Sequence, residues 1–164
     1  MILGWFGDVD LEVDERACRA DRVPILRRIS GGGAVVIGPG CLNYSFVFSL
    51  DRRPELRDVD RSYHLILGWV ADAIGVAGVR RAGVSDLAIG GRKIGGSAQR
   101  RGRRALLHHG TLLYAFNVNA MDRYLKVPTR QPAYRANRSH AGFVTNAPVE
   151  PYLVSTTLTA SLAA

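Results

Sequence analysis

A single lysine, Lys93, stands between two glycine pairs, Gly90-Gly91 and Gly95-Gly96, in the stretch GGRKIGGSAQR. Bare glycine backbone lets a ligand approach closely, and an ammonium group there can reach a phosphate or a carboxylate. The stretch does not match the GxxxxGK[ST] loop, nor GxGxxG in a strand-to-helix context. On these residues alone, Lys93 is either an anion ligand or the solvated tip of a hairpin.

A second glycine run lies in RRISGGGAVVIGPG, at positions 27–40. Gly31–Gly33 follow Arg28 and Ser30, and the apolar residues 34–36 come next. The run is either a plain turn or backbone kept bare so that a charged ligand can lie against it. Residues 34–36 are expected to begin the strand that fixes the run.

Three further features carry chemical side chains. In LHHGTLL, at 107–113, only one of two adjacent strand histidines can face the core, and each is either a packed residue or a functional one. Asp86 either sits in a turn or holds Mg²⁺ or a positive group. The RRGRR run at 100–104 is either an exposed turn or a docking surface for an acidic partner. A nucleic-acid surface is disfavoured because no aromatic residue lies within that run.

The elements that must position these residues follow from periodicity and end signals. CLNYSFVFSL, at 41–50, alternates as a strand with one buried face. Apolar residues at three- and four-residue steps predict a helix that opens at Asp58 or Asp60 and closes at Gly75 or Gly78. Short apolar segments around SDLAIGG, RKIGGSAQR and ALLHHGTLLYAF predict a meander of strands.

The rest of the chain is less regular. A second helix is expected from Asn119 through residue 127, and Pro128 and Pro132 then predict an irregular segment to residue 146. The last stretch, 149–164, is compatible with a helix or a strand. Several strands with few helices indicate an α+β fold with a mainly antiparallel sheet.

Composition limits the alternatives. The 164 residues are 47% hydrophobic, which suits one domain with a real core. Twenty-two basic residues, nearly all arginine, face 14 acidic ones, and the net charge of +8 favours anionic partners. Cys18 and Cys41 form no CxxC motif, which disfavours a disulfide framework and structural zinc. With no long apolar run and no signal-like start, a cytoplasmic protein without a membrane partner is expected.

Taken in order, these stretches resemble the lipoate-protein ligase A branch of the biotin/lipoate ligase and octanoyltransferase superfamily. RRISGGGAV, GPGCLNYSF, DLAIGGRKIGGSAQR and LHHGTLL carry the resemblance, and YLKVP and RSHAGFVTN continue it. It implies a mainly antiparallel, mixed sheet packed with a few helices, like the catalytic domain of class II aminoacyl-tRNA synthetases and biotin protein ligases. It also implies that residues 1–164 form a single catalytic domain lacking the first helix and strand and any C-terminal accessory domain.

The resemblance further implies a two-step reaction. ATP and lipoate give lipoyl-AMP and pyrophosphate, and the acyl group passes to a lysine of an acidic lipoyl acceptor domain, from a 2-oxoacid dehydrogenase complex or the glycine cleavage H protein. Lys93 would contact both the lipoate carboxyl oxygen and the α-phosphate, with Asp86 as its acidic partner through Mg²⁺. The residues implied to bind ATP and lipoyl-AMP are Arg28, Ser30, Gly31, Gly32, Gly33, Ala34, Val35, Val36, Asp86, Lys93, Gly96, Ser97, His109, Gly110 and Thr111.

Two alternatives remain. Octanoyltransferases of the superfamily move octanoyl or lipoyl groups through a cysteine thioester without ATP; in one branch that cysteine lies just before the aspartate of the lysine motif. Here Val84 and Ser85 precede Asp86, and no cysteine follows Cys41, so the ATP-dependent route is favoured. The other alternative is a non-catalytic subunit that binds lipoate, octanoate or a lipoyl domain, and an accessory ligase subunit is a further expected partner.

Overall fold

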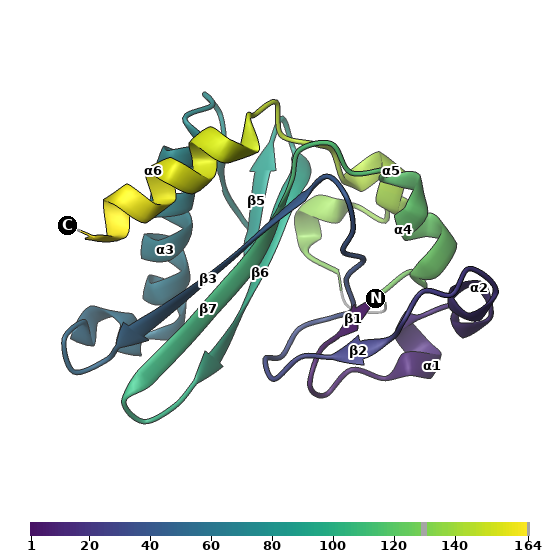
Figure 1. Cartoon of the computed structure of the whole chain (residues 1–164), viewed down its shortest axis with the longest axis horizontal. Coiled ribbons are helices and arrows are strands. Elements are labelled where there is room, and N and C mark those ends of the chain that lie inside the picture. Colours follow the sequence, from purple (N-terminus) through teal and green to yellow (C-terminus); the bar gives the residue numbers. More distant parts are fainter. Residues whose placement is uncertain (129–130, 164) are drawn as a thin grey trace.

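A twisted five-stranded sheet runs through the middle of the protein and separates two groups of helices (Figure 1). The computed structural model describes residues 1–128 and 131–163. The elements, in chain order, are β1 (Ile2–Leu3), α1 (Val9–Glu12), α2 (Glu15–Ala20), β2 (Leu26–Arg27), β3 (Cys41–Ser49), η1 (Pro54–Arg57), α3 (Val59–Ile74), β4 (Arg80–Ala82), β5 (Asp86–Ile89), β6 (Arg92–Arg101), β7 (Ala105–Leu113), α4 (Asn119–Tyr124), η2 (Ala133–Arg135), α5 (His140–Phe143) and α6 (Pro151–Ala163).

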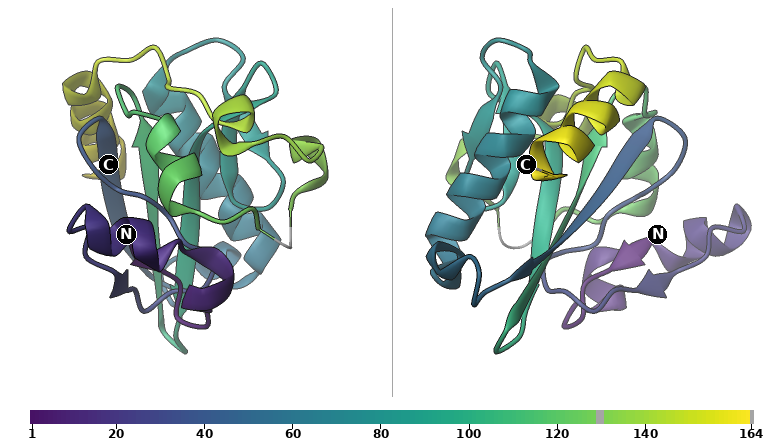
Figure 2. Two further views of the ribbon diagram at one scale, coloured as in Figure 1. Left: turned by 90° about the vertical axis from the view of Figure 1, so that its right-hand side faces the viewer. Right: turned by 60° about the vertical axis from the view of Figure 1, so that its left-hand side comes forward.

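The sheet has the order β3-β7-β6-β5-β4, and every neighbouring pair is antiparallel. A separate parallel pair, β1 and β2, lies on the other side of the molecule from α3 and α6 (Figure 2). The α+β class and the meander of β5, β6 and β7 are therefore confirmed. Strands β3 and β4 form the two edges of the sheet, and β7, β6 and β5 are its inner strands.

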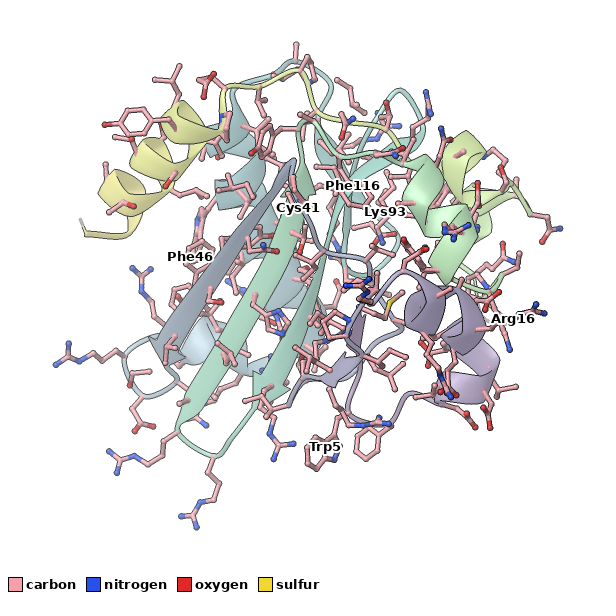
Figure 3. The ribbon with its side chains drawn as sticks, turned by 45° about the vertical axis from the view of Figure 1, so that its right-hand side comes forward. Trp5, Arg16, Cys41, Phe46, Lys93 and Phe116 are labelled. Atoms are coloured by element: carbon pink, nitrogen blue, oxygen red, sulfur yellow. The ribbon has the colours of Figure 1, made fainter. Side chains whose placement is uncertain are left out.

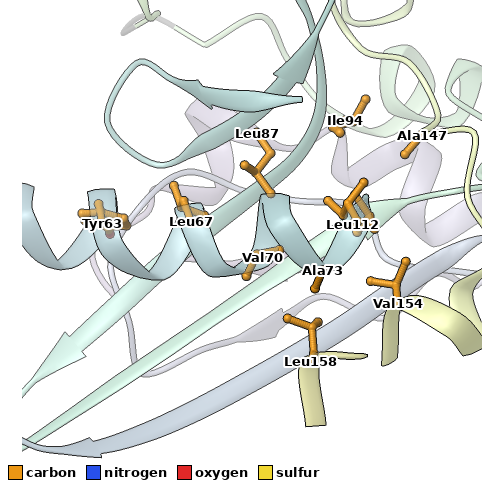
Figure 4. Packing of buried hydrophobic residues seen from close by; sticks show 11 residues of the cluster. Tyr63, Leu67, Val70, Ala73, Leu87, Ile94, Leu112, Ala147, Val154 and Leu158 are labelled. Carbon is orange, nitrogen blue, oxygen red and sulfur yellow. The ribbon is translucent and has the colours of Figure 1, made fainter. Parts of the chain in front are cut away.

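Helix α3 forms where the sequence predicts it. The Asp58 carboxylate accepts a hydrogen bond from the Arg61 amide at 2.7 Å and caps its start. Gly75 ends it in the left-handed conformation, at φ 65°, which glycine adopts without strain. Its apolar stripe, including Leu67 and Val70, packs on the sheet residue Leu112 (Figure 4). Helix α6 packs against the same core.

Three expectations about the remaining segments need correction. Residues 34–36 do not start a strand: only Val35 pairs, with Ile2, and Gly38 and Pro39 follow at once. The second helix stops at Tyr124, because Leu125 turns extended and bridges to Val13. The segment expected to be irregular contains η2 and α5, although its residues 129 and 130 lie outside the described residues.

The last stretch, open in the sequence, is the helix α6. The first 25 residues form β1, α1 and α2, which no pattern in the sequence predicts, and the same holds for β4. Within the described ranges, no helix is both long and apolar enough to cross a membrane.

Candidate functional site

Lys93 and Asp86 form an ion pair on the face of the sheet opposite α3, which we call the site face. The Lys93 ammonium nitrogen lies 2.7 Å from Asp86 Oδ1. The Asp86 side chain is only 10% exposed, so this pair is shielded from water. Figure 3 shows Lys93 between the sheet and the helices that lie opposite its site face. The pairing confirms that the two strands bring these predicted residues together.

A β-bulge places Lys93 on this face. In β5 and β6, Leu87 pairs with Gly95 but Ala88 pairs with Lys93, so Ile94 is an extra residue. In a regular strand that contained residues 93–96 without a bulge, positions 93 and 96 would point to opposite faces, because side chains alternate along a strand. The bulge sends Ile94 into the core beside α3 and returns Lys93 to the side of Asp86.

Gly96 provides the space that the ion pair occupies. A Cβ at this position would lie 2.8 Å from Lys93 Nζ and 3.4 Å from Asp86 Oδ1. Such a contact with Nζ is shorter than side chains tolerate, so any larger residue would displace the ammonium. Gly96 is thus explained by Lys93, and its predicted contact with ATP or lipoyl-AMP stays a prediction.

Tyr134 completes the arrangement, and sequence reasoning missed it. Its hydroxyl donates to Asp86 Oδ2 at 2.8 Å, and its ring packs 5.0 Å from that of Phe143. Burial, followed by the nearby Asp86 charge, raises the pKa of Tyr134, which keeps it a donor at neutral pH. With Lys93 on one oxygen and Tyr134 on the other, the Asp86 carboxylate is fixed in orientation.

The glycine run is held from inside by Arg28. The guanidinium of Arg28 donates to the carbonyls of Gly31 at 2.7 Å and Gly33 at 2.9 Å. Gly32 has φ 88°, a conformation that favours glycine. Gly4 packs against it so closely that a Cβ there would lie 1.9 Å from the Gly32 carbonyl oxygen. The run is therefore a shaped loop, and Arg28 is one of its supports; contact between Arg28 and a ligand stays a prediction.

A second support comes from Glu12, whose carboxylate accepts the Ala34 amide at 2.5 Å. The sequence did not single out Glu12, which belongs to the short helix α1. Gly32 and Gly33 remain exposed despite these contacts. The loop thus offers bare backbone to solvent, while the carbonyls of Gly31 and Gly33 are bound by Arg28 and the Ala34 amide is bound by Glu12.

His109 connects this loop to the sheet. Its Nε2 lies 2.6 Å from Ser30 Oγ, and Ser30 is almost completely buried. Burial, and then the charge of Arg28, lower the pKa of His109. A neutral imidazole therefore joins the glycine run to the site face. Thr111 lies on the same face, opposite Gly96, and donates to Asn43.

Two other predicted residues lie on the opposite face. Ser97 pairs with Gly110 across β6 and β7, and the Ser97 hydroxyl donates to the Ser85 carbonyl at 2.9 Å. A Cβ on Gly110 would lie 2.3 Å from the Tyr44 hydroxyl oxygen, so the ring of Tyr44 requires a glycine there. Packing accounts for Gly110 and a backbone contact for Ser97, whereas their predicted binding role is not supported by their position.

His108, adjacent to His109, points into the core instead. It is fully buried, and its ring stacks on those of Tyr44 and Phe46. Its Nδ1 accepts a hydrogen bond from the side-chain amide of Gln99. Burial lowers its pKa to about 4. The expectation that only one of the two histidines faces the core is confirmed.

The donor set around Asp86 does not fit a metal ion held by the protein alone. Each Asp86 oxygen already accepts a hydrogen bond, from Lys93 or from Tyr134. Within the described part of the chain, no three histidine, cysteine or acidic residues gather at metal-binding distance. What the site offers to an anion is the remaining N–H donors of the Lys93 ammonium and the exposed backbone of Gly32 and Gly33.

Comparison with known proteins identifies similar chains. Residues 1–151 fit the family model of the lipoyl protein ligase A/B catalytic domain. A putative lipoate-protein ligase A of Aeropyrum pernix is 35% identical over 125 residues, which are 75% of this chain and 46% of that protein. Octanoyltransferase LipM of Clostridioides difficile is 24% identical over 155 residues, which cover 82% of this chain and 57% of the transferase.

Solved structures agree. The bi-partite lipoate protein ligase of Thermoplasma acidophilum, studied with its E2 lipoyl domain, superposes with a TM-score of 0.80 at 26% identity, covering 99% of this chain and 65% of that one. A lipoate-protein ligase A bound with ATP gives 0.79 at 26% identity, with 99% and 66% covered. This chain therefore spans less than half of the Aeropyrum relative and about two thirds of the structural ones. The sheet, the Lys93–Asp86 ion pair and the match over residues 1–151 agree, and the chain belongs to the lipoyl protein ligase A/B catalytic domain family.

Proposed function

We propose that this protein activates lipoate with ATP and transfers the lipoyl group to a lysine of a lipoyl acceptor domain. The observation that carries the proposal is the shielded Lys93–Asp86 ion pair beside a shaped glycine loop. The structural relative bound with ATP, and the one studied with its E2 lipoyl domain, support the nucleotide and the acceptor class. Lipoate, octanoate and the H protein stay as predicted substrates and partners, and a cytoplasmic location stays a prediction.

In the first step, a carboxylate oxygen of lipoate attacks the α-phosphorus of ATP, and the bond to the β-phosphate oxygen breaks, releasing pyrophosphate. Both reactants are anions, so their approach is opposed by repulsion. The Lys93 ammonium has three N–H donors, and Asp86 uses one of them. The other two can bind the lipoate carboxylate and the α-phosphate, which offsets the repulsion in the transition state.

In the second step, the neutral amine of the acceptor lysine attacks the acyl carbonyl, the bond from the acyl carbon to the phosphate oxygen breaks, AMP leaves with the bonding electron pair, and the nitrogen loses one proton to water as the amide forms. Asp86 and Tyr134 do not touch the reacting atoms in this scheme. They hold Lys93 in place before the substrates arrive, so no reorganisation is needed at the moment of reaction. The donor set around Asp86 does not fit a Mg²⁺ ion held by the protein alone, so neither step uses magnesium. Magnesium binding by Asp86 stays a prediction.

A thioester route is the second candidate, because an octanoyltransferase is among the relatives. It requires a reactive thiolate, which is favoured by a lowered thiol pKa. Burial instead raises the pKa of both Cys18 and Cys41. Cys18 belongs to α2 and is almost fully buried against the core. The chemistry of the two thiols therefore supports the ATP-dependent route.

The test is lipoate-dependent pyrophosphate release from ATP, measured for the wild type and for Lys93→Ala. Loss of one preorganised charge-stabilising group typically lowers the rate about 10²- to 10³-fold. The matched control is Lys126→Ala, since Lys126 is the other lysine of the chain and lies exposed, with its ammonium on the Asp10 carbonyl. The control should release pyrophosphate at the wild-type rate.

Undiminished release by Lys93→Ala would remove the proposed role of Lys93. A labelled octanoyl or lipoyl group trapped on Cys18 or Cys41 without ATP would establish the transferase instead. Tight lipoate binding by a wild type that releases no pyrophosphate would identify a non-catalytic subunit.

A further inference from the structure

One end of the sheet carries a concentration of arginines, which we call the arginine end. It comprises residues 51–58, after β3, and residues 100–104, around the turn between β6 and β7. These two segments contain seven arginines and three acidic residues, so they supply a net four of the eight positive charges of the chain. They are joined directly, because Leu50 donates to the Arg104 carbonyl and Arg101 donates to the Arg57 carbonyl.

Part of this charge is not neutralised. Arg57 and Arg104 share the carboxylate of Asp51. Arg100 and Arg103 are exposed, and among the ion pairs of the described residues neither has a carboxylate partner. Unpaired exposed guanidinium groups create a positive field that attracts acidic surfaces.

A second exposed feature lies at the same end of the molecule. The turn after β1 presents Trp5 and Phe6, which are 50% and 87% exposed. In Figure 3, Trp5 lies at the lower edge of the molecule, where the turn between β6 and β7 also lies. In all three views of Figures 1 and 2, the turn after β1 and the turn between β6 and β7 lie toward the same end of the molecule. Large exposed aromatic side chains at one place are typical of protein interfaces.

The turn that presents Trp5 and Phe6, which we call the aromatic turn, has its backbone held by Arg27. One guanidinium nitrogen of Arg27 contacts three of its carbonyls, those of Gly4, Trp5 and Gly7, at 2.8–2.9 Å. A backbone segment that is held in place before binding loses less entropy on binding. The turn is therefore suited to present Trp5 and Phe6 from a fixed backbone.

The same turn is fastened to the glycine loop of the candidate site. The Trp5 amide donates to the Ser30 carbonyl at 2.8 Å, and Gly4 packs directly on Gly32. Ser30 in turn contacts His109 on the site face. A protein docked on Trp5 and Phe6 therefore contacts the border of the pocket in which the acyl-adenylate would form.

We propose that Trp5 and Phe6, together with Arg100 and Arg103, form the docking surface for the acidic acceptor domain whose lysine receives the acyl group. The inference rests on the proposed function, because it assigns a surface to its second substrate. The aromatic anchors supply affinity at the pocket border, and the arginine end steers the acidic domain toward it. A nucleic acid would use the positive charge but has no need of a position beside the glycine loop.

Two double variants test the surface, with an unlipoylated E2 lipoyl domain of a 2-oxoacid dehydrogenase complex as the probe. W5A/F6A should raise the KM for the lipoyl domain roughly 10- to 100-fold, as loss of interface anchors does. R100E/R103E should raise it about 10-fold at low salt and less at high salt, because exposed charges are screened. Pyrophosphate release without the lipoyl domain should be unchanged in both.

The matched controls lie elsewhere. Y152A/L153A removes an equally exposed apolar pair from α6, and R16E/R19E reverses two charges on α2. Both should keep the wild-type KM. An unchanged KM in W5A/F6A and R100E/R103E would overturn the proposal. So would duplex DNA binding that the variants abolish while lipoyl-domain binding persists, or a wild-type dimer that W5A/F6A converts to monomer.

Direct calorimetric binding of the lipoyl domain separates this inference from the proposed function. If the wild type releases no pyrophosphate, the proposed function fails, yet the affinities of the four variants for the lipoyl domain still test the surface. Weaker binding by the two surface variants alone supports it, and equal binding by all four contradicts it.

Discussion

Replacing Gly96 by alanine tests whether the position of the Lys93 ammonium matters for the reaction. The added methyl group would lie 2.8 Å from Lys93 Nζ and 3.0 Å from its Cε. An ordinary contact requires roughly 0.6 Å more, since carbon and nitrogen atoms rarely approach closer than about 3.4 Å. Because these atoms belong to the free end of a flexible side chain, the ammonium moves and the backbone does not.

The stability of Gly96→Ala should therefore stay within about 1 kcal/mol of the wild type, since alanine is also favoured over glycine in a strand. Activity should change far more. Catalytic groups need placement to about 0.5 Å, and a misplacement near 1 Å costs on the order of 10²-fold. We expect lipoate-dependent pyrophosphate release to fall about 10²-fold, with a melting temperature close to that of the wild type.

Gly95→Ala is the control at the neighbouring position. Its Cβ would lie 2.7 Å from the backbone oxygen of Thr111, which cannot move away, so this variant should lose about 1–3 kcal/mol of stability. The double variant G96A/K93A should be no slower than K93A, because both changes act through one group. Wild-type release by Gly96→Ala, or additive losses in the double variant, would refute the reasoning.

Three further predictions concern other parts of the molecule. Tyr134→Phe removes one hydrogen bond from Asp86, worth about 1–1.5 kcal/mol, so pyrophosphate release should fall roughly 10-fold; an unchanged rate would exclude positioning by the hydroxyl. His108, with its pKa lowered to about 4, binds its proton more weakly in the folded than in the unfolded protein, so the free energy of unfolding should fall by up to about 3 kcal/mol between pH 6.5 and pH 4. Urea titrations of His108→Leu across this range should lack that loss of unfolding free energy. An equal loss in the wild type and in His108→Leu would contradict the prediction. Gly110→Ala should lower the free energy of unfolding by about 1–3 kcal/mol, and with it the melting temperature, through its contact with Tyr44; a loss of activity without loss of stability would instead support nucleotide binding at Gly110.

The elements that the sequence predicted best are those with strong local signals. Strand β3 alternates over its whole length, and α3 has both its cap at Asp58 and its left-handed glycine at Gly75. The helices α1 and α2 have four and six residues, too few for a helical period to emerge. Their stability comes from contacts distant in sequence, such as Val13 with Leu125.

The candidate site follows the same rule. Lys93, Asp86 and the glycine run were recognisable from residue type, spacing and resemblance. Tyr134 was not, because its partner Asp86 lies 48 residues away and nothing around Tyr134 marks it. Gly110 enters the predicted site through the resemblance, whereas the strand register places it opposite Ser97, where the ring of Tyr44 covers it. Pair register, which the sequence does not display, decides such cases.

The bulge at Ile94 separates two tasks within β6, since it adds a core side chain without moving the lysine of the site. A substitution at Ile94 alters the volume of the core and leaves Lys93 on its own side of the sheet. Deleting Ile94 would restore regular pairing with β5 and keep Lys93 opposite Ala88, on the site face. What the deletion removes is a fully buried side chain beside α3, so its cost is a loss of core packing. Both changes at this position are therefore expected to affect stability before they affect the placement of the ammonium.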